Sequence, residues 1–168
     1  MGEPITEGEL AFTFPDSALS VVKFDDPKTH GASVMKAVDF IVEFPDYDLY
    51  VEVKDADHSE ADEGRRQAFL EKLKSGKLEN ALVYKYRDPR SYRWCEGKTT
   101  KPARYVVMLQ LETLQPRDYQ LWTDKLKQRL PLEGPASWSR PLVDRVWVIN
   151  AATWNRLGVF GAVARKVQ

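Results

Sequence analysis

Residues 38–44, VDFIVEF, and residues 49–54, LYVEVK, decide the fold of this chain. In both runs apolar side chains alternate with others, which predicts two β-strands. The residues between them, Pro45-Asp-Tyr-Asp48, have the composition of a turn, so the two runs should form a hairpin. One face of that hairpin is apolar, and the other carries Asp39, Glu52 and Lys54.

The pairing of the two strands decides which of these side chains meet. If the hairpin closes symmetrically around Asp46-Tyr47, Asp39 lies opposite Lys54, with their Cβ atoms about 5 Å apart, and diagonal to Glu52 at about 7 to 8 Å. A register one residue off would mix polar and core positions, which a half-buried sheet resists. Two carboxylates and an ammonium should therefore converge. The alternative is a cross-strand ion pair on a solvated face, which is common and contributes little.

Asp39, twelve further residues and then Glu52-Val53-Lys54 on an adjacent strand resemble the active-site signature of the PD-(D/E)XK nuclease superfamily. The resemblance covers residues 36–87. It implies an α/β, restriction-endonuclease-like domain over residues 1–168, with a central mixed β-sheet flanked by helices. It also implies that Asp39, Glu52 and Lys54 are catalytic.

The chemistry of phosphodiester hydrolysis explains why these residue types are needed. Mg²⁺ or Mn²⁺ binds carboxylates and backbone carbonyls, so Asp39, Glu52 and the carbonyl of Val53 form the expected metal site. Lys54 would orient or deprotonate the attacking water, or neutralise charge on the phosphorus centre. Its role among these is open.

Composition narrows the class of protein. The chain has 168 residues, of which 43% are hydrophobic and 30% charged, as in an ordinary globular protein. No run is long and apolar enough for a membrane span and no signal peptide is evident, so we expect a cytoplasmic protein. A single cysteine, Cys95, excludes an intramolecular disulfide, and with only two histidines a Cys/His zinc site is not expected.

The charges are unevenly distributed although they sum to zero. Residues 1–64 contain 4 Lys/Arg and 16 Asp/Glu, a net charge of −12, whereas residues 65–104 carry +8 and residues 105–168 carry +4. The carboxylates of the first segment could bind a metal ion, and the lysines and arginines of the second could bind phosphates. This distribution suits a site that cleaves nucleic acid. The alternative is charge scattered over a solvated surface.

Downstream of the hairpin we predict a helix over 60–75, with Gln67 as a candidate site contact, and then a strand over 81–87. Residues 88–103 are interpreted as an irregular loop in which basic and aromatic side chains alternate, suited to phosphates and stacked bases. The alternative is that the aromatic residues pin the loop to the core. The predicted nucleic-acid-binding residues are Lys85, Arg87, Arg90, Arg93, Trp94, Lys98 and Lys101.

The remainder should be architectural, with strands over 104–112 and 143–149, a helix from Pro116 to Pro131 and a short helix over 153–157. One feature departs from the family, whose members usually have a helix before the Asp strand that often supplies another acid. Here residues 11–14 and 19–24 are strand-like. The periodicity of the sequence does not indicate which upstream acid would supply this additional ligand. The candidates are Glu9, Asp16, Asp25 and Asp26.

Two functions follow from these observations. The first is a Mg²⁺- or Mn²⁺-dependent nuclease that acts on DNA, in repair, recombination or defence against foreign DNA. The second is a catalytically inactive member of the fold that binds nucleic acid or protein. The sequence leaves open whether the substrate is DNA or RNA, whether cleavage is internal or terminal, and whether a homodimer or a larger protein complex forms.

Overall fold

A mixed five-stranded sheet forms the centre of the molecule, and a smaller sheet and the helices cover its two faces. The computed structural model describes residues 2–32 and 34–166. In chain order its elements are β1 (Ile5–Glu7), β2 (Leu10–Thr13), β3 (Ser20–Lys23), β4 (Phe40–Glu43), β5 (Asp48–Asp55), α1 (Glu63–Lys74), α2 (Lys77–Cys95), β6 (Ala103–Gln110), α3 (Pro116–Arg129), β7 (Arg145–Ile149), α4 (Ala151–Leu157) and β8 (Ala162–Arg165).

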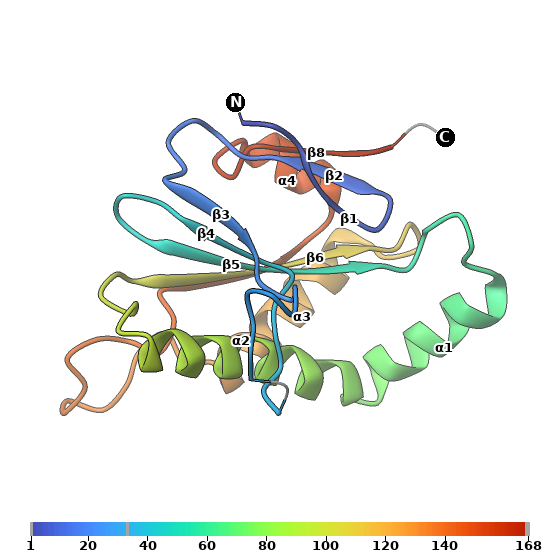
Figure 1. Ribbon diagram of the computed structural model, residues 1–168. Coiled ribbons are helices and arrows are strands. Elements are labelled where there is room, and N and C mark those ends of the chain that lie inside the picture. The colour runs from blue at the N-terminus through green and yellow to red at the C-terminus, as the bar shows by residue number, and fades with distance from the viewer. Residues whose placement is uncertain (1, 33, 167–168) are drawn as a thin grey trace.

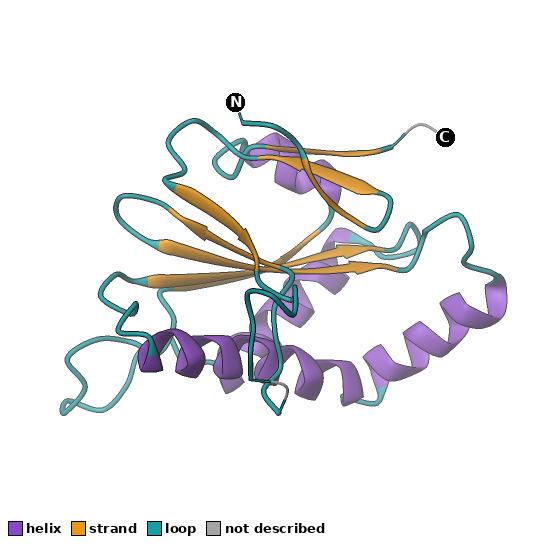
Figure 2. Cartoon of the chain, in the orientation of Figure 1, coloured by secondary structure: helices purple, strands orange, loops and turns teal. Residues whose placement is uncertain are grey.

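The central sheet has the strand order β3-β4-β5-β6-β7. β3, β4 and β5 form an antiparallel meander, whereas β5, β6 and β7 run parallel to one another. Parallel strands need a long crossover, and α1 with α2 supply it between β5 and β6. The small sheet, β1-β2-β8, lies with α4 on one side of the central sheet, and α1, α2 and α3 lie on the other (Figure 1, Figure 2). The predicted α/β class is confirmed.

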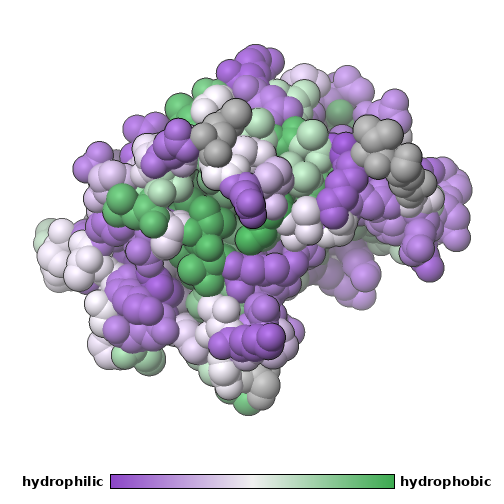
Figure 3. Space-filling view, turned by 45° about the horizontal axis from the view of Figure 1, so that its top comes forward, coloured by the Kyte–Doolittle hydropathy of each residue, from purple (hydrophilic) through white to green (hydrophobic). Residues whose placement is uncertain are grey.

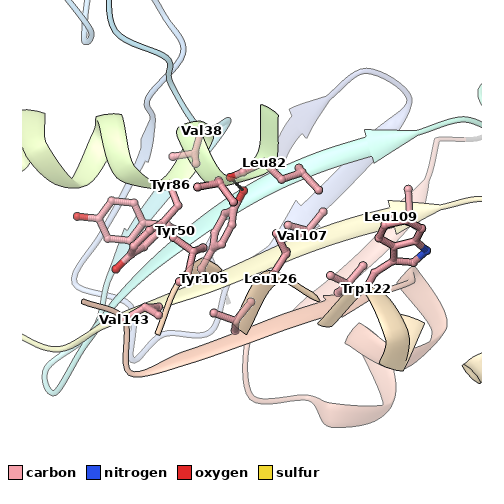
Figure 4. Packing of buried hydrophobic residues seen from close by; sticks show 14 of the residues in the cluster. Val38, Tyr50, Leu82, Tyr86, Tyr105, Val107, Leu109, Trp122, Leu126 and Val143 are labelled. Atoms are coloured by element: carbon pink, nitrogen blue, oxygen red, sulfur yellow. Dashed lines mark hydrogen bonds between the residues drawn. The ribbon is translucent and has the colours of Figure 1, made fainter. Parts of the chain in front are cut away.

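Both faces of the central sheet are buried. On the helix side, Ile41, Tyr50 and Tyr105 pack against residues of α2 and α3, and the Tyr105 hydroxyl donates to the Leu82 carbonyl at 2.9 Å (Figure 4). On the other side, alternate residues of the hairpin pack against β2, α4 and β8. The face that carries Glu52 is therefore covered by helices, and the alternative of a solvated sheet face is wrong.

Little apolar surface remains on the face shown in Figure 3. Hydrophobic side chains reach the surface there mainly in a central strip, which hydrophilic residues surround. Among the described residues, none of the four helices combines the length and the hydrophobicity needed to cross a bilayer.

The predicted hairpin forms, but its register differs from the prediction by two residues. Ile41 pairs with Tyr50 and Glu43 with Asp48, because the connection consists of residues 44–47 rather than a two-residue turn. A shift of two keeps every side chain on its predicted face. Continued by one residue, the observed register places Asp39 opposite Glu52, so the predicted pairing of Asp39 with Lys54 is wrong.

The largest error concerns residues 77–95, which form the helix α2. The predicted strand over 81–87 is wrong, and so is the irregular stretch from residue 88, because the loop before β6 covers only residues 96–102. Leu82, Tyr84 and Tyr86 alternate with their neighbours as the residues of a strand would. The residues that are buried in the structure are instead spaced as on one face of a helix. The buried residues of α2 are Leu78, Leu82, Val83, Tyr86, Pro89 and Arg93.

The other predicted elements form with shifted ends. Asp62 caps α1 by accepting from the Arg65 amide at 2.8 Å, and Gly76 (φ 77°) adopts the left-handed conformation between α1 and α2. Pro116 begins α3 as predicted. The short strands β1 and β8 were not predicted, and β1 contributes a residue to the site described next.

Candidate metal centre

Four acidic side chains gather where β3, β4 and β5 meet the small sheet, and we call Glu7, Asp25, Asp39 and Glu52 the acid cluster. Glu7 ends β1, Asp25 follows β3, Asp39 precedes β4 and Glu52 lies within β5. Carboxylate oxygens of Glu7, Asp25 and Asp39 lie within 4.8 Å of one another. Asp39 is 6% exposed and Glu52 is 0% exposed. Glu52 is not in that group of three, but its charge raises the pKa of Asp39, which places it beside the group.

Asp39 is positioned by the backbone of the neighbouring strand. Its Oδ2 accepts a hydrogen bond from the Val53 amide at 2.6 Å. Burial, and then the negative charge of Glu52, raise the pKa of Asp39 to about 7, although the Val53 amide acts in the opposite direction. Burial is the main cause of this shift and the charge of Glu52 the second, so Asp39 loses its proton near neutral pH, and a cation beside the two acids would favour the ionised form.

Glu52 is held by two lysines that share one of its oxygens. Its Oε1 lies 2.6 Å from Lys54 Nζ and 3.2 Å from Lys85 Nζ. Burial lowers the pKa of Lys54, but the attraction of Glu52 outweighs burial, and the pKa lies above its usual value. Lys54 comes from the same strand as Glu52, whereas Lys85 reaches across from α2.

Two carboxylate oxygens in the cluster have no hydrogen-bond partner in the part of the chain that the structure describes. Glu52 Oε2 and Asp25 Oδ1 are buried, and neither has a hydrogen-bond partner among the described residues. Buried polar atoms are normally satisfied, so each such atom needs an explanation. Unpaired carboxylate oxygens are ligands that suit Mg²⁺ or Mn²⁺, so the residues present fit a divalent cation.

The predicted upstream acids differ in their positions. Asp25 joins the cluster, as the sequence allowed. Glu9 instead accepts from Ser59 and Arg165, and hydrogen bonds from Ser59 and Arg165 hold its pKa below the usual value. Asp26 accepts from the Lys28 amide at 2.9 Å. Neither Glu9 nor Asp26 is in the group formed with Asp39.

Glu7 is the site residue that sequence reasoning missed. It lies in a three-residue strand, and its only sequence signal is that it is one more acid in an acidic segment. Its side chain pairs with Lys23 at 2.7 Å, and this hydrogen bond raises the pKa of Lys23. Glu7 and Lys23 bring the small sheet to the edge of the cluster.

Most of the predicted nucleic-acid-binding residues lie away from the acid cluster. Of these residues only Lys85 contacts it. Trp94 follows Lys85 by nine residues, and at 3.6 residues per turn this places it on the opposite side of α2. Trp94 is 69% exposed, and with Arg90 it lines a separate pocket of about 570 Å³ that Trp138 and Arg140 complete.

The remaining predicted cations contact other parts of the protein. Arg93 pairs with Glu43, Lys101 with Asp48 at 2.9 Å, and Lys98 with Glu96 at 3.6 Å. Arg87 donates to the Arg129 carbonyl at 3.0 Å. Gln67 is exposed on α1, and the Val53 side chain lies in the core as expected. The structure thus brings Asp39, Glu52, Lys54, Asp25 and Lys85 together and leaves the other candidates apart.

Comparison of the chain with protein-family models, with curated proteins and with solved structures gives no match. The chemistry of the acid cluster is therefore inferred from its own residues.

Proposed function

We propose that this protein is a metal-dependent nuclease that hydrolyses phosphodiester bonds, with DNA as the favoured substrate. The observation that carries the proposal is the buried Glu52, whose Oε2 has no hydrogen-bond partner among the residues described, beside an Asp39 with a raised pKa and two lysines. The resemblance to the PD-(D/E)XK superfamily supports it, because Asp39, Glu52 and Lys54 lie in the same site. The mixed sheet with helices on one face is compatible with a restriction-endonuclease-like fold.

Asp39 and Glu52 would hold Mg²⁺ or Mn²⁺, with Asp25 and Glu7 as further ligands. A bound divalent cation would polarise a phosphoryl oxygen and lower the pKa of a bound water. In the hydrolysis, the water oxygen forms a bond to phosphorus, the bond from phosphorus to the leaving sugar oxygen breaks, and the proton lost by water is balanced by one gained by the leaving oxygen. Lys54 Nζ, beside Glu52, would orient that water or stabilise charge on the phosphoryl oxygens.

The test is cleavage of defined substrates by the purified protein. Duplex DNA, single-stranded DNA and RNA would each be incubated with Mg²⁺, with Mn²⁺ and with a chelator. We expect cleavage of DNA that the chelator stops, and a loss of at least about a hundredfold in Glu52→Gln. Asp46→Asn, at an exposed acid in the hairpin turn, is the matched control and should cleave like the wild type.

Cleavage that persists in the chelator, or in Glu52→Gln, would contradict the proposal. A protein that binds nucleic acid and never cleaves it would favour the second candidate, a non-catalytic binding module. The observation that favours this candidate is the pocket beside Trp94, because Trp138 is also 46% exposed there and two arginines accompany the two indoles. Indoles with arginines suit stacking on bases as well as protein contacts.

A further inference from the structure

Lys85 occupies a place in the acid cluster that the two-strand signature does not provide. Its Nζ lies 3.2 Å from Glu52 Oε1, the oxygen that Lys54 Nζ already contacts at 2.6 Å. The Lys85 side chain is 26% exposed, so it reaches the buried carboxylate from the solvent side. One oxygen of this carboxylate thus faces two ammonium groups, while the other has no hydrogen-bond partner within residues 2–32 and 34–166.

The packing of α2 fixes this position of Lys85. Lys85, Asp88 and Tyr92 are spaced i, i+3 and i+7, so they share one face of the helix. Residues 26–32 and 34–38, which we call the strap, cross that face on the way from Asp25 to Asp39 (Figure 1). Asp88 Oδ2 accepts from the Lys36 amide at 2.7 Å, and the Tyr92 hydroxyl donates to the Thr29 carbonyl at 3.3 Å.

The Tyr92 ring also stacks on His30 of the strap, with a distance of 4.8 Å between ring centroids. These contacts attach α2 to the strap, and the two ends of the strap adjoin the acids Asp25 and Asp39. This arrangement holds the face of α2 that carries Lys85 towards the cluster.

A divalent cation on Glu52 Oε2 would change the balance of charge around Lys85. It would add two positive charges beside two ammonium groups that share a single carboxylate, and like charges at such distances repel. Lys54 is fixed next to Glu52 by the strand that carries both. Lys85 has a flexible four-carbon stem on a different element and can turn towards solvent at little cost. A phosphate entering the site is the anion that it would meet there.

We propose that Lys85 is a second catalytic lysine, which leaves Glu52 Oε1 when a divalent cation binds and then contacts a non-bridging oxygen of the phosphodiester. This inference rests on the proposed nuclease function. It assigns the two lysines different partners: Lys54 stays beside Glu52 and the attacking water, and Lys85 stabilises charge on the phosphoryl group.

The test is Lys85→Met, which keeps the length of the stem and removes the charge, with Lys77→Met as the matched control. Lys77 is exposed at the start of the same helix. Two quantities would be measured in each variant: Mn²⁺ affinity by calorimetry, without substrate, and the single-turnover rate of DNA cleavage at saturating Mn²⁺. We expect the rate in Lys85→Met to fall by about 10² to 10³, and Mn²⁺ affinity to be equal or higher. Lys85→Arg should recover part of the rate.

Three outcomes would overturn the inference. Unchanged cleavage by Lys85→Met would show that Lys85 does not contact the phosphate, and the nuclease function would stand. A parallel loss of Mn²⁺ affinity and rate would mean that Lys85 only orients Glu52. A wild type that binds Mn²⁺ and cleaves no nucleic acid would remove the proposed function and this inference with it. Lys85→Gln serves in place of Lys85→Met if thermal unfolding shows that the latter is not folded.

Discussion

The two ends of the β4–β5 hairpin both bury acidic side chains, but their surroundings differ. At the turn end, each acid pairs with a different cation: Asp48 with Lys101 at 2.9 Å, and Glu43 with Arg93, which also lies 3.7 Å from Glu96. At the other end, the four acids of the acid cluster share three lysines, and two of those lysines converge on one oxygen of Glu52.

The difference shows that buried acids alone do not indicate a ligand site. Where each carboxylate pairs with a different cation, the pair holds the hairpin to α2 and the loop before β6. At the acid cluster, Glu52 Oε2 and Asp25 Oδ1 have no hydrogen-bond partner among the described residues, and burial raises the pKa of Asp39 to about 7. Asp48 Oδ1 at the turn end also has no hydrogen-bond partner there, but it lies 2.9 Å from Lys101 Nζ. Two substitutions and one pH series test whether the two ends have different roles.

The largest effect is expected for Asp39→Asn. The rate of metal-dependent DNA cleavage should fall by about a thousandfold, because the amide is a poor ligand for Mg²⁺. The variant can keep the hydrogen bond from the Val53 amide, and it removes a buried charge beside Glu52, so the metal-free protein should be more stable at pH 8. Cleavage assays and urea unfolding measure the two effects. A variant that loses both activity and stability would show that Asp39 stabilises the fold and is not a metal ligand.

Asp48→Ala should lower the stability of the protein and leave the cleavage rate unchanged, the opposite of Asp39→Asn. Asp48 is 1% exposed, and its loss leaves the ammonium of Lys101 without its carboxylate, which should cost about 3 kcal/mol of unfolding free energy. The cleavage rate per folded molecule, measured well below the unfolding temperature, should equal that of the wild type. A large loss of rate in the folded variant would show that the turn end also serves the site.

The third test is the pH dependence of stability. The pKa of Asp39 is about 7 in the folded protein and near its usual 3.8 in the unfolded chain, so between these values the folded state holds a proton that the unfolded state has lost. Stability of the metal-free protein should therefore decrease as pH rises from about 4 to about 7, by up to about 1.4 kcal/mol per pH unit from this group, and level off above 7.

Other groups titrate in the same range, so the difference between wild type and Asp39→Asn isolates this contribution. Urea unfolding at several pH values in the presence of a chelator measures it. A difference that does not vary with pH would mean that Asp39 is ionised throughout, and its raised pKa would be wrong.

The sequence predicted those parts of the site that depend on alternation along strands. Asp39, Glu52 and Lys54 lie on the expected face because a register shift of two residues preserves the face. The register itself depends on how residues 44–47 close the hairpin, which composition does not specify. Lys85 was a predicted phosphate contact, but on a strand, because alternation over residues 82–86 concealed the helical spacing of Leu78, Leu82 and Tyr86.

Glu7 and the true surroundings of Glu52 depend on tertiary structure. The small sheet joins β1 and β2 to β8, from the two ends of the chain, and that contact brings Glu7 to Asp25 and Asp39. No local pattern records it. The burial of Glu52 likewise follows from the helices that cover the sheet, whereas the strand sequence alone allows a solvated face.

The sharing of Glu52 Oε1 by two lysines bears on the order in which the protein matures. Some small metalloproteins cannot fold until their ion arrives, because the ion supplies the free energy that closes the structure. Here the chain's own ammonium groups neutralise the buried carboxylate, so a newly made chain can complete its core before it meets a divalent cation. Under the proposed function, removal of the cation would stop cleavage and leave the rest of the molecule folded, so that the ion could bind again.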